Sequence, residues 1–123
     1  MTDQAFLRCN LYQLRQEPVR AHDGEGEVWF TRVATAAGLR GACNFIDFTT
    51  VPPGASIGEH SHAADQEEFY LVLAGSGRML CGGESFDVTA GDLVRNPPGG
   101  THALRNTGAG PLRLFVFELQ VRG

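Results

Sequence analysis

The sequence contains no lysine: all ten of the basic side chains among its 123 residues are arginine. Without a lysine amine, the chain alone cannot form a Schiff base with a carbonyl substrate or with pyridoxal phosphate. It also lacks the lysine that a Walker-type loop uses to bind phosphate. The formal net charge is −4 and the arginines are scattered along the chain, so we predict no basic face for nucleic acid.

Cysteines and long apolar segments are also scarce. Cys9, Cys43 and Cys81 are odd in number and widely spaced, which fits neither a disulfide framework nor a zinc knuckle. The longest apolar run, residues 69–74, is far shorter than the roughly 20 residues of a membrane-spanning helix. Residues 1–26 show no cationic start followed by an apolar stretch. We therefore predict a cytoplasmic protein with no membrane partner.

Short segments rich in β-branched and aromatic residues, separated by glycine and proline turns, fill most of the sequence. This pattern is typical of an all-β sandwich or barrel. The length predicts a single domain over residues 1–123, with an N-terminal arm and loop over 1–27 and a barrel over 28–121. The predicted strands cover residues 28–33, 43–51, 56–62, 68–73, 77–81, 84–88, 93–96, 102–106 and 112–119.

Three of the four histidines lie in or at the ends of predicted strands. Alternate residues of a strand share a face, so His60 and His62 present two imidazoles side by side. A nearby carboxylate would complete a site for a divalent transition metal. Glu68 shares the even-numbered face if the alternation continues, and Glu67 is the alternative if the intervening loop resets it. His102, far along the chain, is a third imidazole.

These residues fall in two stretches that resemble the two motifs of the cupin family. One departure concerns the glutamate: five residues separate His62 from Glu68, whereas the motif has three or four. Glu67 keeps that spacing but misses the motif's last glycine by one position, so the choice between the two stays open. The first stretch contains Gly54, His60, His62, Glu68 and Gly75, and the second contains Gly91, Pro97, Gly99, His102 and Asn106.

The resemblance implies a double-stranded β-helix, or jelly-roll barrel, that holds one divalent ion through His60, His62, Glu68 and His102. Iron, manganese, zinc, nickel and copper all suit such ligands, and iron is slightly favoured. Cupins with these ligands include dioxygenases of small organic molecules, decarboxylases, isomerases and lyases. Many cupins also pair, and we expect a homodimer here.

The predicted function is that of a metal-dependent enzyme of dioxygenase type with a small organic substrate. The alternatives are a non-redox isomerase, lyase or decarboxylase, and a non-catalytic ligand-binding or sensor cupin. Tyr70 and Glu67 are the candidate catalytic acid or base residues. His22 lies outside both motifs in a polar loop, and we predict that it is solvated. The predicted, mostly apolar substrate lining consists of Asn44, Ile46, Phe48, Val72, Asn96 and Leu104.

Overall fold

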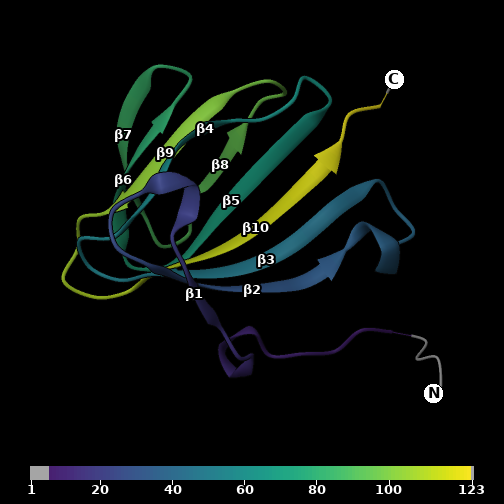
Figure 1. The fold of residues 1–123 in the computed structure, drawn as a ribbon, viewed down its shortest axis with the longest axis horizontal. Coiled ribbons are helices and arrows are strands. Elements are labelled where there is room, and N and C mark those ends of the chain that lie inside the picture. Colours follow the sequence, from purple (N-terminus) through teal and green to yellow (C-terminus); the bar gives the residue numbers. More distant parts are fainter. Residues whose placement is uncertain (1–5, 123) are drawn as a thin grey trace.

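The computed structural model describes residues 6–122, which form two antiparallel sheets facing each other (Figure 1). One sheet has six strands in the order β1-β2-β3-β10-β5-β8, and the other has four in the order β4-β9-β6-β7. The predicted all-β class and jelly-roll barrel are confirmed. The strands are β1 Glu17–Val19, β2 Val28–Thr35, β3 Cys43–Val51, β4 Ser56–Ser61, β5 Gln66–Ala74, β6 Ser76–Cys81, β7 Glu84–Thr89, β8 Leu93–Asn96, β9 Thr101–Asn106 and β10 Leu112–Gln120.

Side-chain alternation places the core between the two sheets. Along β10, Leu112, Leu114 and Val116 are buried, and their intervening neighbours are more exposed. Strand β5 pairs with β10 and buries Glu68, Tyr70 and Val72 on the same inner side. Each fully buried aliphatic side chain contributes about 1.5–3 kcal/mol. The predicted even-numbered inner face of β5 is therefore present.

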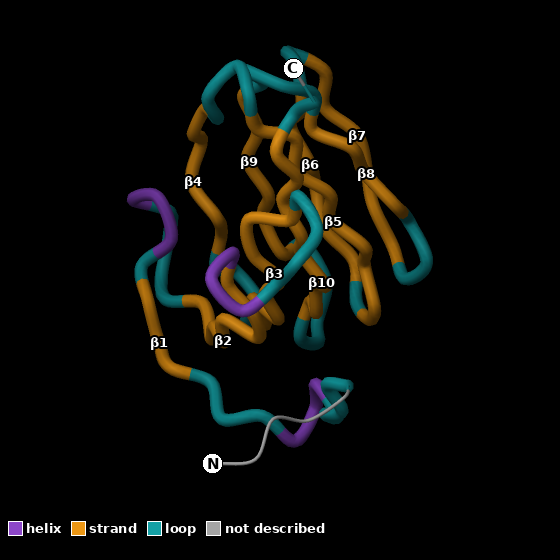
Figure 2. The backbone as a smooth tube through the Cα atoms, turned by 90° about the vertical axis from the view of Figure 1, so that its right-hand side faces the viewer, coloured by secondary structure: helices purple, strands orange, loops and turns teal. Residues whose placement is uncertain are grey.

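Three short 3-10 helices interrupt the strands: η1 Leu11–Gln13, η2 Ala21–Asp23 and η3 Ala36–Gly38. The predicted N-terminal arm is partly regular, because β1 pairs with β2 at the sheet edge (Figure 2). Before β1, Tyr12 packs edge-on against Phe48, with 5.5 Å between ring centroids. The arm therefore covers part of the outer face of the six-stranded sheet.

The turn between β5 and β6 depends on a glycine. Gly75 has a φ of +85°, and a Cβ there would lie 2.4 Å from the carbonyl oxygen of Pro111. Any side chain at this position would collide with backbone, so only glycine fits. Within the described residues 6–122, no helix is long and apolar enough to cross a membrane.

Candidate metal centre

Four predicted ligands meet at one end of the barrel, although they come from three strands and both sheets. One donor atom from each of His60, His62, Glu68 and His102 lies within 4.8 Å of the others. The histidines belong to the four-stranded sheet: His60 lies in β4, His62 directly after it, and His102 in β9 opposite His60. Glu68 reaches them from β5 of the six-stranded sheet. We call these four residues the donor end.

The spacing of the donor atoms fits a shared ion. The Nε2 atoms of His62 and His102 are 3.0 Å apart, and they lie 3.2 and 3.1 Å from Glu68 Oε1. Two donors bound at about 2.1 Å to one ion, at right angles to each other, lie about 3 Å apart. Within residues 6–122, Glu68 Oε1 is buried and has no polar partner other than these two ring nitrogens. The donor set therefore fits a divalent transition metal, which would satisfy that oxygen.

Hydrogen bonds fix the orientation of two of the imidazoles. His60 Nδ1 donates to the carbonyl oxygen of Gly58 at 2.7 Å, which leaves Nε2 as the free donor atom for an ion. His62 Nδ1 lies 3.0 Å from Glu118 Oε1, and Asn44 Nδ2 donates to the other Glu118 oxygen at 2.9 Å. Such outer partners fix the ring tautomer and strengthen a ligand. Glu118 is thus a supporting residue that the motifs do not contain.

The protonation states of His60 and Glu68 suit metal binding. Burial lowers the pKa of His60 to about 4, so its imidazole is neutral near pH 7. Burial alone would raise the pKa of Glu68, but the adjacent His102 and His62 imidazoles outweigh it and lower that pKa to about 2. A neutral imidazole and an ionised carboxylate are the forms that bind a metal ion.

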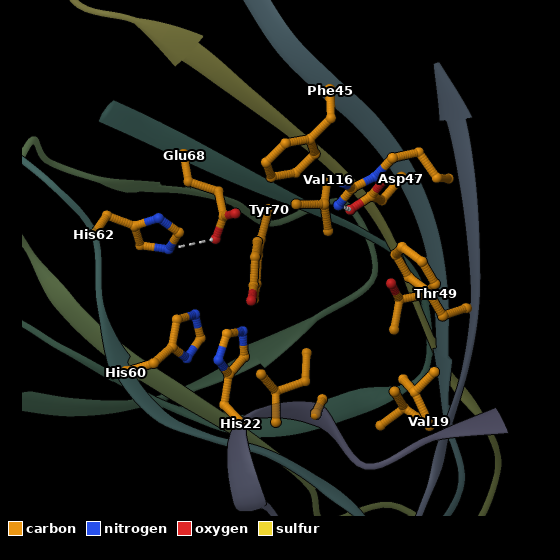
Figure 3. Close-up of a pocket in the computed structure, with 15 residues that line it drawn as sticks. Val19, His22, Phe45, Asp47, Thr49, His60, His62, Glu68, Tyr70 and Val116 are labelled. Carbon is orange, nitrogen blue, oxygen red and sulfur yellow. Dashed lines mark hydrogen bonds and ion pairs between the residues drawn. The ribbon is translucent and has the colours of Figure 1, made fainter. Parts of the chain in front are cut away.

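A cavity of about 360 Å³ opens next to three of these donors (Figure 3). Its far wall, as we use the term, consists of Arg32 on β2 and Phe45, Asp47 and Thr49 on β3. Tyr70 stands between the donor end and the far wall, and its hydroxyl points into the open space. Burial raises the pKa of Tyr70 well above its usual value, so the hydroxyl keeps its proton.

A half-buried ion pair shapes the far wall. Arg32 Nε donates to Asp47 Oδ1 at 2.9 Å and Arg32 Nη2 donates to Asp47 Oδ2 at 3.1 Å. The guanidinium carbon also lies 4.4 Å from the centre of the Phe45 ring. Asp47 is buried, whereas the Arg32 side chain is about half exposed and lines the cavity. This bidentate contact uses Nε and Nη2, so Nη1 is the guanidinium nitrogen that it leaves for an anionic group of a ligand.

The structure places the predicted substrate lining elsewhere, because none of its six residues lines this cavity. Asn44 contacts Glu118 behind His62. Phe48 lies under Tyr12 on the outer side of β3, the same parity as Ile46. Val72, Asn96 and Leu104 are buried in the interior. The residues of β3 that line the cavity are instead the odd-numbered Phe45, Asp47 and Thr49. The charged Asp47 is accommodated on this face because Arg32 pairs with it.

Glu67 is also placed away from the cavity. It follows the opposite parity on β5, and its carboxylate contacts Arg95 Nε. Glu68, not Glu67, joins the three histidines. The position of Glu67 therefore does not favour the catalytic role suggested for it, whereas Tyr70 does face the cavity.

Sequence reasoning missed the fourth histidine. His22 in η2 lines the cavity, and its ring stacks on His60 with 3.5 Å between centroids and 7° between planes. The prediction that His22 is solvated is confirmed, because the residue is exposed, but its contact with His60 and its place in the cavity wall were not predicted. No periodic pattern could have placed His22, because a packing contact between distant segments brings it to β4.

A β barrel with a buried cluster of three histidines and one glutamate defines a class of metal-binding proteins. A cupin domain is recognised over residues 47–118, more than half of the chain, and the chain belongs to the cupin family. The oxalate-binding protein of Thermotoga maritima is 29% identical over 85 residues, which cover 69% of each chain. An uncharacterized protein of Methanocaldococcus jannaschii is 38% identical over 65 residues, 53% of this chain and 51% of that relative.

Solved structures share the fold. A predicted oxalate decarboxylase from Thermotoga maritima matches with a TM-score of 0.88 at 23% identity, covering 94% of this chain and 100% of that one. A cupin 2 conserved barrel domain protein from Salinispora arenicola matches with a TM-score of 0.70 at 19% identity, covering 97% and 91%. At this level of identity the matches establish the architecture and leave the activity open.

Proposed function

We propose that this cupin binds a divalent metal and a small organic anion next to it, and that it catalyses a dioxygenase-type reaction. The observation that carries the proposal is the convergence of the four donors on a cavity that also holds the Tyr70 hydroxyl and the Arg32 guanidinium. Three histidines and one glutamate would leave coordination positions free on an octahedral ion. Iron is the favoured ion among those that suit these ligands.

Residues of the chain would hold the substrate in this site. The Nη1 atom of Arg32 would bind a carboxylate or enolate oxygen, and the Tyr70 hydroxyl would donate a hydrogen bond. Phe45 and Val116 would pack against the carbon skeleton, because both line the cavity with apolar surface. A bound ion would supply a Lewis acid and, if it is iron, a site for dioxygen.

The proposed chemistry needs no external reductant. An enolate of the form O⁻–C=C–H reacts with O2 to give a carboxylate and an aldehyde. The carbon–carbon double bond breaks, both oxygen atoms enter the products, and the substrate carbons supply the electrons that reduce O2. The negative charge of the enolate stays on the carboxylate, so atoms and charge balance.

A second candidate function is ligand binding without turnover. The specific observation that favours it is the 29% identity to a protein named for binding oxalate. Oxalate is a small dianion, and Arg32 supplies a positive group in the cavity. A cupin of this kind would use the same donors and the same cavity with no reaction.

Oxygen uptake separates these functions. Protein loaded anaerobically with Fe(II) would be mixed with O2 and a panel of enolates, with oxalate as a further probe. We expect O2 consumption and product formation with at least one enolate. Carbon dioxide release or isomerisation without O2 uptake would instead establish non-redox chemistry. Tight oxalate binding without any turnover would establish the binding protein.

We also propose that the chain forms a homodimer. The outer face of the six-stranded sheet supports this proposal, because Phe69 and Phe117 stack there with 4.8 Å between centroids beside Phe115. Apolar patches of this kind often pair with a second copy. Light scattering after size-exclusion chromatography would give twice the monomer mass, and a monomer at micromolar concentration would contradict the proposal. The cytoplasmic location stays a prediction.

A further inference from the structure

The segment of residues 19–25, which we call the strap, packs against β4 and places His22 beside His60 at the donor end (Figure 3). Close backbone packing fixes its position. A Cβ on Gly24 would lie 2.2 Å from the carbonyl oxygen of Ser56, and a Cβ on Gly58 would lie 2.0 Å from the carbonyl oxygen of His22. Because both positions are glycine, the strap and β4 can approach this closely.

Hydrogen bonds to one serine hold the end of the strap. Ser56 N donates to the Glu25 carbonyl oxygen at 2.9 Å, and Glu25 N donates to Ser56 Oγ at 2.8 Å. Within the strap, His22 and Asp23 both have positive φ, 50° and 58°. Such a backbone is uncommon for residues other than glycine and persists where the surrounding structure imposes it. The strap is therefore a fixed wall of the site.

The stacking contact leaves the edge of the His22 ring facing the cavity. One face of the ring lies flat on His60, so the contact uses the face and not the edge. Figure 3 shows the nitrogen-bearing edge of His22 and the Tyr70 hydroxyl directed toward the same open space. His60 presents its own edge there as well. A ligand in that space would meet His22 and Tyr70 from two sides.

We propose that His22 is a specificity-determining residue that hydrogen-bonds the small organic anion held at the metal. This inference rests on the proposed function, because it requires an anion at the donor end. The chemical class of the ligand is a carboxylate or enolate, whose oxygen atoms accept hydrogen bonds from an imidazole N–H and from a tyrosine hydroxyl. The donor end would bind the ion, and the strap would select what binds next to it.

Cobalt(II)-loaded protein, titrated anaerobically with oxalate and with acetylacetonate, tests this role. Co(II) suits the same ligands and reports changes in its coordination through its visible spectrum. In His22→Phe the aromatic face on His60 is retained and both ring nitrogens are lost. We expect Co(II) affinity within about twofold of wild type and anion affinity lower by about tenfold, the loss typical of one hydrogen bond to a charged group.

Two further variants sharpen the test. Gly24→Ala displaces the strap without changing any ring, and we expect it to reduce anion affinity as His22→Phe does. Glu84→Gln, a change on exposed β7 outside the strap and the cavity lining, is the control and should bind both anions as wild type does.

The outcomes separate this inference from the proposed function. Unchanged anion affinity in His22→Phe would overturn the role of His22. Loss of Co(II) binding in that variant would also overturn it, because His22 would then serve only to support His60. If wild-type protein binds Co(II) but neither anion, the proposed function fails and this inference fails with it.

Discussion

The donor end and the far wall face each other across one cavity, but they are built in different ways. Each donor belongs to a short motif on β4, β5 or β9, and strand geometry fixes its direction. The far wall contains a charged pair, Arg32 and Asp47, that no motif includes. Local spacing therefore encodes the part that binds an ion, and long-range packing builds the part that meets a ligand. Variants in the two regions should have separable effects.

Glu68 gives the largest expected effect and tests the donor end. In Glu68→Ala, the only carboxylate of the donor set is lost, and we expect metal affinity to fall by at least about a hundredfold. Glu67→Ala removes the neighbouring carboxylate on the other face of β5, and we expect a change below about twofold, as for an exposed ion pair. Isothermal titration with Zn(II) measures both. Equal losses in the two variants would contradict the assignment of Glu68.

Substitution of Arg32 tests whether the far wall stabilises the folded protein. Arg32→Ala leaves Asp47 buried without its partner, and we expect the free energy of unfolding to fall by about 2 kcal/mol near pH 7. The matched control is Arg78→Ala, which breaks an exposed pair with Asp87 and should cost less than about 0.5 kcal/mol. Urea unfolding measures both variants. Equal costs would show that the Arg32 pair adds nothing beyond a surface contact.

The pH dependence of the Arg32→Ala effect has a defined sign. Burial already raises the pKa of Asp47, and Arg32 opposes that rise. Without Arg32 the pKa rises further, because burial and the negative charges of Glu68 and Glu118 both favour the protonated form of Asp47. A folded-state pKa above the unfolded value of about 4 makes stability fall as pH rises between the two. The deficit of the variant should therefore shrink from pH 7 toward pH 4.

The sequence predicted the donor end because its information is local. His60 and His62 share a face through the two-residue period of strands, and the same period along β5 selects Glu68 beside Tyr70. The far wall could not be predicted in this way. Both faces of β3 are covered: Phe48 by the N-terminal arm, and Asp47 by the barrel interior. When both faces of a strand are covered, the alternation of its residues does not show which face lines the cavity. The even-numbered face of β3, with Ile46 and Phe48, is therefore predicted to line it, whereas in the structure the odd-numbered face does.

Glu118 connects the two regions and has an intermediate expected effect. It is the last of the alternate residues of β10 that are buried, and its carboxylate contacts His62 Nδ1. Glu118→Gln keeps the size but removes the charge that supports that imidazole, and we expect metal affinity to fall about tenfold. Glu84→Gln makes the same change on exposed β7 and serves as the control. Unchanged affinity in Glu118→Gln would confine the metal site to the four donors.

Tyr70 has the smallest expected effect because its hydroxyl belongs to neither region. The ring is buried and lies 5.0 Å from the His102 ring, whereas the hydroxyl faces the cavity. In Tyr70→Phe the packing of the ring is retained, so metal affinity and unfolding free energy should stay at wild-type values. The affinity of the Co(II) protein for oxalate should fall by about three- to tenfold, the loss of a single hydrogen bond at the low end of the range for charged acceptors. Unchanged oxalate affinity would mean that the ligand does not reach Tyr70, and the far wall and strap would then have to hold it without this hydroxyl.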